Sequence, residues 1–235
     1  SGRVGWGDAT LIVNPWDEYA LEEALVRGKE AGGKATVIAI GGEIHNEALK
    51  HALAMGMDGA IRVDDPAFEN ADSLAYASTA AAAAQKAGAN LILAGKESVD
   101  VGSDQHLVQL ARKLGWPYLS NVAHITALSD TSATVERLID GGKQTVTCPL
   151  PAVMTVTKEI NEPRFPSFIG IRKASKAVIP VWSLADLGVS LPAPRATVAG
   201  FRNPPAREAK TEMITGTPAE QAATLVDRLF EEKVL

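Results

Sequence analysis

The first half of the chain alternates between helical and strand-like hydrophobic periods, and this alternation constrains the fold more than any other feature. Apolar residues recur at helical spacing from about Pro15 to Ala31, with Asn14 in the N-cap position. The short apolar run from Ala35 to Ile40 is typical of a buried strand. Further segments alternate in the same way: a helix over about 48–55, a strand over 59–63, an alanine-rich helix over 70–87, a strand over 90–94 and a helix that ends near residue 115.

Strands that are separated by helices of this length pair in parallel through right-handed crossovers. We therefore predict an α/β fold, with a doubly wound, mostly parallel sheet and helices on both of its faces.

The second half changes pattern. Two runs, His124–Leu128 and Thr134–Ile139, flank the polar turn Ser129–Ser132, which predicts a β-hairpin. Beyond Val181 the chain is rich in Pro and Gly and closes with an amphipathic helix from about Pro218 to Lys233. Because one such helix cannot build its own core, we predict an α/β domain over residues 1–182 and an extended arm over 183–235 that does not fold by itself.

Composition excludes several classes of function. The net charge of -5 argues against a nucleic-acid surface, since phosphate binding needs clustered Lys and Arg. Cys148 is the only cysteine, so the chain has no internal disulfide and no thiolate cage for a metal or an iron–sulfur cluster. The most apolar stretch, Ala75–Ala84, is too short to span a bilayer, and the first ten residues lack the pattern of a secretion signal, which indicates a protein that is not inserted in a membrane.

Three polar segments are expected at the carboxyl ends of the predicted strands, where ligands bind in open parallel sheets. One starts the first helix, one ends a strand at Gly41 and Gly42, and the third is a long loop. Glycines let backbone amides approach a phosphate, and a helix amino terminus favours an anion there. The candidate nucleotide-binding residues are Asn14, Pro15, Trp16, Asp17, Gly42, Gly95, Lys96, Glu97, Ser98, Val99, Asp100, Val101, Gly102, Ser103, Asp104, Gln105 and His106.

Other interpretations of these segments stay open on pattern alone. Turns of any α/β domain are rich in Gly, Ser and Asp, and Gly41–Gly42 completes neither a GxGxxG nor a Walker pattern. Ser98, Asp100 and His106 carry triad residue types but lack the GxSxG elbow, which disfavours a hydrolase. The four histidines share no metal-ligand spacing, so we predict neither a metal site nor catalytic side chains.

A long motif in the second half resembles the signature segment of electron-transfer flavoprotein beta subunits. It runs from Val135 to Val146 as VERLIDGGKQTV and continues as PAVMT from Pro151. Further family-like strings occur in family order: NPWDEYA from Asn14, ALAMG from Ala52, LAGK from Leu93, LGWP from Leu114 and NEPR from Asn161. The match spans about residues 13–176.

This resemblance implies a beta subunit that pairs with an alpha subunit and has no bond-making chemistry of its own. In the family, FAD lies mainly in the alpha subunit near the interface and the beta subunit buries AMP. The pair shuttles electrons from acyl-CoA dehydrogenases, as in fatty acid β-oxidation, to a membrane electron-transfer flavoprotein–quinone oxidoreductase. The compartment is the cytoplasm in bacteria and the mitochondrial matrix in eukaryotes, and the 183–235 arm would pack on the alpha subunit.

The segment after Asn161 resembles the family's recognition loop, which projects an apolar anchor toward dehydrogenases. Phe168 stands at the anchor position, and the alternative is that Phe165 and Phe168 cover the sheet. The residues that this resemblance assigns to partner docking are Arg164, Phe168, Ile169, Arg172 and Lys173, with Lys176 as a further basic residue.

The chain departs from the family pattern in three places. The apolar first strand that members carry before the Asn14 segment is not recognisable here, Leu138 stands where many members are acidic, and His106 replaces a small residue. Two alternatives therefore remain: a bifurcating flavoprotein subunit with FAD in place of AMP, and an adenine-nucleotide protein of the universal-stress type, which shares the topology.

Overall fold

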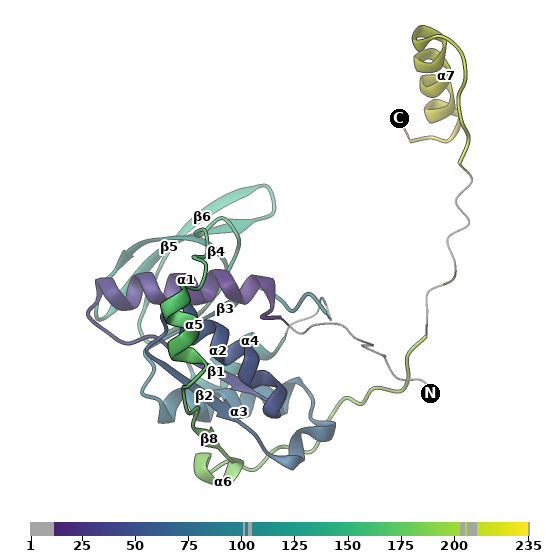
Figure 1. Cartoon of the computed structure of the whole chain (residues 1–235). Coiled ribbons are helices and arrows are strands. Elements are labelled where there is room, and N and C mark those ends of the chain that lie inside the picture. Colours follow the sequence, from purple (N-terminus) through teal and green to yellow (C-terminus); the bar gives the residue numbers. More distant parts are fainter. Residues whose placement is uncertain (1–11, 101, 103–104, 203–204, 206–210, 235) are drawn as a thin grey trace. The chain divides into compact units, whose positions relative to one another are not determined.

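The computed structural model describes residues 12–100, 102, 105–202, 205 and 211–234, and these form two compact units that divide between Val198 and Ala199. The first unit contains every strand found among the described residues, and the domain boundary expected at residue 182 stays a prediction. The second unit contains the helix α7 (Pro218–Glu231). Figure 1 shows the elements in chain order.

The first unit alternates helices and strands as the sequence pattern predicted. Its elements are α1 (Pro15–Glu30), β1 (Thr36–Ile40), the 3-10 helix η1 (Glu43–His45), α2 (Asn46–Met55), β2 (Gly59–Val63), the 3-10 helix η2 (Pro66–Asn70), α3 (Ser73–Lys86), β3 (Leu91–Gly95), α4 (His106–Leu114), β4 (Tyr118–Leu128), β5 (Ser132–Ile139), β6 (Gly142–Pro149), β7 (Ala152–Val156), α5 (Phe168–Ala174), β8 (Val181–Trp182) and α6 (Leu184–Leu187). The α5, β8 and α6 elements were not predicted from the sequence.

The strands form two sheets, of orders β1–β2–β8 and β3–β7–β4–β5–β6. All pairs are parallel except β4–β5 and β5–β6, which are antiparallel. The predicted hairpin is therefore β4–β5, and β6 extends it into a three-stranded ribbon. The sequence predicted a single sheet, but the strands form two sheets. β1 is an edge strand of one sheet and β3 is an edge strand of the other, and they do not pair with each other.

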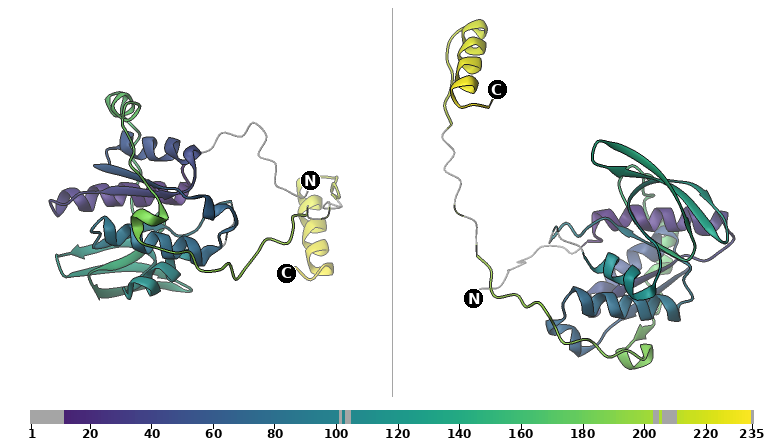
Figure 2. Two further views of the ribbon diagram at one scale, coloured as in Figure 1. Left: turned by 90° about the horizontal axis from the view of Figure 1, so that it is seen from below. Right: turned by 180° about the vertical axis from the view of Figure 1, so that it is seen from behind.

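Helices cover both faces of these sheets, which confirms the doubly wound arrangement. On one face, Leu21 of α1 and Ala52 of α2 pack with Val37 of β1. On the other, Ala77 of α3 and Leu110 of α4 pack against the central sheet in a second cluster. Figure 2 shows helices on either side of the strands. Successive side chains of each strand point to opposite faces of its sheet, so the nearly continuous apolar strands β1, β3 and β7 contribute to both of these layers.

The β4–β6 ribbon has its own core. Val122, Val135 and Met154 are fully buried in a cluster that joins the ribbon to β7. The side chain of Cys148 is buried there too, and burial raises the pKa of its thiol. This cysteine therefore has the character of a packing residue and not that of a reactive thiolate.

Helix α7 is described by itself. Thr217 and Glu220 form a reciprocal capping box at its start, in which Glu220 Oε2 accepts from the Thr217 backbone N–H at 2.8 Å. None of its residues is buried, and Leu225, Val226 and Phe230 are exposed. Within the described residues, no helix of the chain combines the length and apolarity needed to cross a membrane.

Candidate functional site

The start of α1 and the loop after β3 are joined by a compact group of hydrogen bonds. Asn14 donates through Nδ2 to the Glu97 carbonyl oxygen and to Asp17 Oδ2, both at 2.9 Å, and its Oδ1 accepts from the Val99 N–H at 3.1 Å. Asp17 Oδ1 accepts from the Gly95 N–H at 2.7 Å. We call these five residues the Asn14 cluster. It brings together two of the three segments that the sequence predicted to meet at one rim.

Gly95 is the position where the backbones come closest. A Cβ atom there would lie 2.5 Å from Trp16 Cβ and 2.6 Å from the Trp16 carbonyl carbon. Real Cβ atoms do not approach other heavy atoms this closely, so only glycine fits while α1 keeps its place. The end of β3 and the beginning of α1 are thus packed backbone against backbone.

Trp16 and Lys96 form the charged edge of this site. The Lys96 ammonium lies 4.4 Å from the centre of a Trp16 ring and 3.0 Å from Glu97 Oε1. Trp16 also lies beside Tyr19, with ring centres 6.3 Å apart. A cation held over an indole face by a carboxylate is well placed to approach an anionic group at the same rim.

The rest of the loop is described only in part. Gly102 donates its N–H to the Ser98 carbonyl oxygen at 2.8 Å and has a positive φ of 61°, which makes a tight turn around the exposed Asp100. The candidate residues Val101, Ser103 and Asp104 lie outside the described residues.

Several helices begin at these segments without a side-chain cap. Pro15 is the first residue of α1, and the Asn14 side chain makes no cap because it is bonded to the loop. Gln105 makes no side-chain cap at α4, and Gly42 makes none at η1. Uncapped helix starts carry N–H groups and a partial positive charge that an anion can satisfy.

Gly42 lies between β1, which belongs to the other sheet from β3, and η1. The neighbouring Gly41 accepts a hydrogen bond from Arg62 Nη1 at 3.2 Å and leaves room for the His45 ring, since a Cβ on it would lie 2.3 Å from that ring. Among the described residues, no hydrogen bond joins Gly42 to the Asn14 cluster. The structure therefore unites the first and third predicted segments directly and leaves the second as a neighbouring strand end.

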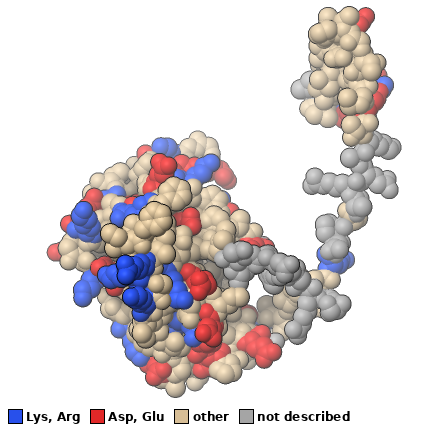
Figure 3. All heavy atoms as spheres, in the orientation of Figure 1, with Lys and Arg blue, Asp and Glu red and all other residues tan. Residues whose placement is uncertain are grey.

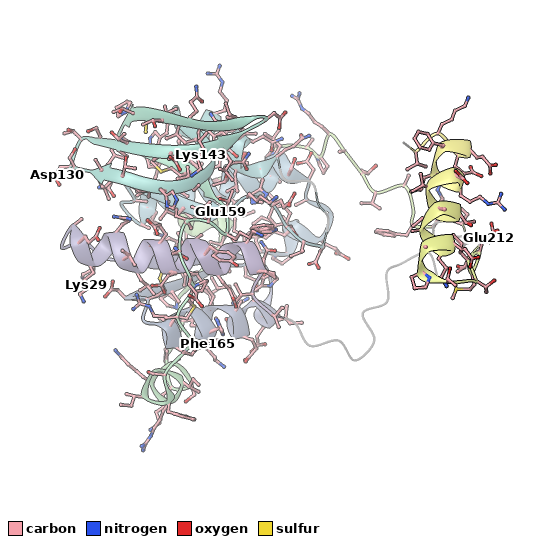
Figure 4. All side chains as sticks on the ribbon, turned by 90° about the horizontal axis from the view of Figure 1, so that it is seen from above. Lys29, Asp130, Lys143, Glu159, Phe165 and Glu212 are labelled. Atoms are coloured by element: carbon pink, nitrogen blue, oxygen red, sulfur yellow. The ribbon has the colours of Figure 1, made fainter. Side chains whose placement is uncertain are left out.

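The predicted docking residues lie on a different part of the domain, in a projecting segment that we define as residues 164–174. Phe165 and Phe168 are each 94% exposed and Ile169 is 83% exposed. The alternative in which these aromatic side chains cover the sheet is therefore wrong. Figure 4 shows α5 standing out from the body of the domain with Phe165 beside it.

Exposed basic residues follow these apolar side chains along α5. Arg172 and Lys173 lie in the last turn of α5, and both are exposed, as is Lys176. Figure 3 shows Lys and Arg side chains gathered where α5 lies in Figure 1. Arg164 differs from them, because its guanidinium is bonded to Glu22 through Nε and Nη2, both at 2.7 Å.

Two acidic residues of α1 that bind Arg164 and Asn161 were missed as site residues. Glu22 and Glu23 are adjacent on α1 and are only 7% and 2% exposed. The hydrogen bond from Arg164 is the largest cause that lowers the pKa of Glu22. In the sequence, these residues are two neighbouring acidic residues beside Leu21 in an amphipathic helix. This pattern does not indicate that Glu22 pairs with Arg164, which lies 142 residues away in the chain.

The chemistry that these side chains can supply is limited. Among the described residues, no group of three His, Cys, Asp or Glu side chains could hold a metal ion. What the domain offers is a set of backbone amides and charged side chains at one rim, and an apolar, basic projection elsewhere.

Comparison with known proteins identifies the family. Residues 8–187 match the family described as the electron transfer flavoprotein domain. The chain belongs to the electron transfer flavoprotein beta-subunit family. The beta subunits of this family are electron carriers.

Two relatives of this electron transfer flavoprotein chain match it over nearly their whole length. The electron transfer flavoprotein subunit beta of Bacillus subtilis is 32% identical over 235 residues, which cover 99% of this chain and 91% of the relative. The caffeyl-CoA reductase-Etf complex subunit CarD of Acetobacterium woodii is 36% identical over 232 residues, which cover 95% of this chain and 88% of the relative. The family resemblance inferred from the VERLIDGGKQTV motif is therefore confirmed.

Proposed function

We propose that this subunit binds AMP at the rim formed by the Asn14 cluster and the start of α4, and that it pairs with an FAD-bearing alpha subunit. The observation that carries the proposal is the start of α1 at the Asn14 cluster, where Asn14 bonds the loop after β3 and makes no cap, with α4 beginning at the end of the same loop. Backbone amides at a helix start fit a phosphate group, and the close packing at Gly95 holds the beginning of the loop against α1. The residues that would hold the nucleotide are Gly42, the loop from Gly95 to Gln105 and the first turn of α4.

Asn14 and Asp17 have an indirect role in this proposal. Their polar atoms are bonded to Gly95, Glu97 and Val99, so they order the loop that would surround the phosphate. Redox chemistry would come from FAD when the complex carries it. The chain's own residues would bind, orient and shield the nucleotide.

The projecting segment would dock the electron donors, acyl-CoA dehydrogenases. Exposed apolar side chains next to basic residues are typical of an interface anchor, and Phe168 and Ile169 supply that apolar surface. Arg172 and Lys173 would attract acidic partner surfaces. The downstream acceptor would be the membrane quinone oxidoreductase, and the pathway fatty acid β-oxidation.

The α7 unit would pack on the alpha subunit. Its exposed Leu225, Val226 and Phe230 form an apolar surface that a partner would cover. In the division proposed from the sequence, with a domain over 1–182 and an arm over 183–235, this partner would be the alpha subunit of the heterodimer.

Mass spectrometry of the small molecules released from the denatured heterodimer tests the nucleotide assignment. We expect one AMP and one FAD per heterodimer. Two FAD molecules and no AMP would contradict it and would favour a bifurcating subunit. That second candidate is favoured by the 36% identity to CarD, which is named as a subunit of a caffeyl-CoA reductase complex.

A further inference from the structure

Helix α1 buries two adjacent carboxylates, which soluble proteins do only when the charges are paired. Glu23 accepts from Arg27 Nε at 2.7 Å and from Asn161 Nδ2 at 3.0 Å. Glu22 accepts from the side chain of Arg164 at two atoms and from its backbone N–H at 3.2 Å. Except for the Arg27 bond, all of these come from Asn161 and Arg164, and Arg164 is the first residue of the projecting segment.

The attachment of this strand of chain to α1 is reinforced by the backbone. Asn161 Nδ2 also donates to the Tyr19 carbonyl oxygen at 3.0 Å. Residues 161–164 therefore lie along one side of α1, one to two turns from the Asn14 cluster at the helix start.

The other end of the projecting segment is fixed on α2. A Cβ on Gly170 would lie 2.3 Å from the Ala54 carbonyl oxygen, so the backbone of α5 touches the last turn of α2. Ser167 caps α5 by accepting from the Gly170 N–H at 3.0 Å. Phe165, Phe168 and Ile169 thus lie between two attached positions, Arg164 on α1 and Gly170 on α2. The path of the backbone between these positions keeps the three side chains exposed.

Two-point anchoring of this kind matters for binding. A flexible segment with two phenylalanines lowers its free energy by folding them against the domain. Binding to a partner then costs conformational entropy, because the segment must become ordered with both rings exposed. A bidentate carboxylate–guanidinium contact has a fixed geometry, so it sets the direction in which the chain leaves α1. Removing one member leaves the other charge unpaired.

We propose that Glu22 and Glu23 are positioning residues that hold the projecting segment in its docking conformation, with Glu22–Arg164 as the principal contact. The proposal rests on the docking role given above. It assigns Arg164 to α1 and not to the partner's surface.

The test uses the intact heterodimer and an acyl-CoA dehydrogenase as donor. Glu22→Gln keeps the size of the side chain and removes its charge. We expect the KM for the heterodimer as electron acceptor to rise by roughly tenfold with kcat unchanged, the factor that corresponds to about 1.4 kcal/mol of lost preorganisation. Flavin absorbance and released nucleotide should stay normal, and amide exchange should accelerate at Ile169–Ile171. Glu18→Gln, one turn away on α1 with its carboxylate near His51, is the matched control and should change neither.

A double variant separates the positioning role from direct contact with the partner. If Arg164 acts through Glu22, then Glu22→Gln with Arg164→Ala should raise KM no more than Glu22→Gln alone. Additive effects would overturn the proposal, since they would mean that Arg164 binds the partner directly. Arg164→Lys, which leaves no buried charge unpaired, should raise KM in the same direction by a smaller factor, and no rise would also overturn it.

Phe168→Ala distinguishes failure of this inference from failure of the docking role. An unchanged KM in Phe168→Ala would retire docking by this segment, and the inference with it. A raised KM in Phe168→Ala together with an unchanged KM in Glu22→Gln would retire the positioning role alone.

Discussion

Helices of the first unit begin in two different ways. At α3 the Asp72 side chain accepts the Ala75 N–H at 3.1 Å, and at α5 and α6 the hydroxyls of Ser167 and Ser183 do the same for their helices. In these helices, the side chain of the N-cap residue accepts a hydrogen bond from a first-turn backbone amide that would otherwise lack an intrahelical partner.

The helices at the proposed nucleotide rim lack this device. No cap is made by Asn14 at α1, by Gln105 at α4 or by Gly42 at η1. Asn14 is a residue type that caps well, yet it is bonded to the loop after β3 instead. In the proposed function the rim would give up some local helix stability so that its amides could face a ligand, whereas α3, α5 and α6 are stabilised by side chains of their own segments.

Of the substitutions that test this contrast, Gly95→Ala should have the largest effect on stability and on bound nucleotide. The new Cβ would meet the Trp16 backbone, so α1 must shift away from β3 and the Asn14 cluster must break. We expect a loss of about 3 kcal/mol or more in the free energy of unfolding, together with loss of bound nucleotide. Chemical denaturation and nucleotide content of the purified heterodimer measure both.

Gly33→Ala is the matched control for this substitution, because the nearest atom to its Cβ would lie 3.8 Å away. It should leave stability and nucleotide content unchanged. A Gly95→Ala heterodimer that keeps its nucleotide would contradict the close packing of α1 on β3.

A carboxylate placed at an uncapped helix start should have the next largest effect. Gln105→Asp supplies the cap that α4 lacks, so the helix itself should not be weakened. The same carboxylate would repel a phosphate, and we expect the dissociation constant of AMP to rise by roughly tenfold, which corresponds to about 1.4 kcal/mol. Isothermal titration of the nucleotide-depleted heterodimer measures it, with Gln105→Asn as the neutral control. Equal affinity of the two variants would mean that the start of α4 does not face the phosphate.

Removal of an existing cap should have a smaller and purely local effect. Ser167→Ala takes away the acceptor of the Gly170 N–H, and we expect about 1 kcal/mol less protection of the first-turn amides of α5. Ser175→Ala, at the other end of α5, where the hydroxyl donates to the Arg172 carbonyl oxygen, is the control. Hydrogen exchange read residue by residue separates the two. A change in nucleotide content in Ser167→Ala would show that the two sets of helix starts are not independent.

Sequence pattern predicted the parts of the fold that depend on local periodicity. The strand at Gly59–Val63 and the helix that begins at Pro15 were placed correctly, since an apolar run and a proline at the first helical position are local signals. The short elements α5, β8 and α6 were missed, because two to seven residues are too few to establish a period.

The long-range contacts of the site were beyond the sequence for a different reason. Asn14 was expected to approach a nucleotide, but it is engaged by Glu97 and Val99, and Glu22 binds Arg164 far along the chain. A single sequence shows which side chains are polar and where helices begin. It does not show which distant residue pairs with each, because that depends on how the layers pack.

The smallest expected effect is a loss of amide protection at low pH at the start of α3, which is capped by the carboxylate of Asp72. Hydrogen bonds to the backbone N–H groups of Arg195 and Ala75 lower the pKa of Asp72 from its ordinary value of 3.8. A lowered pKa in the folded protein means that the stabilisation is complete above the ordinary value and is lost only as pH falls through the folded one. Protection of the Ala75 amide should therefore be constant from pH 7 to pH 5 and should decline below 3.8. In Asp72→Asn the same amide should show no such decline, and the uncapped start of α4 should not respond in this window; loss of Ala75 protection already between pH 7 and pH 5 would contradict the assignment of the cap to the Asp72 carboxylate.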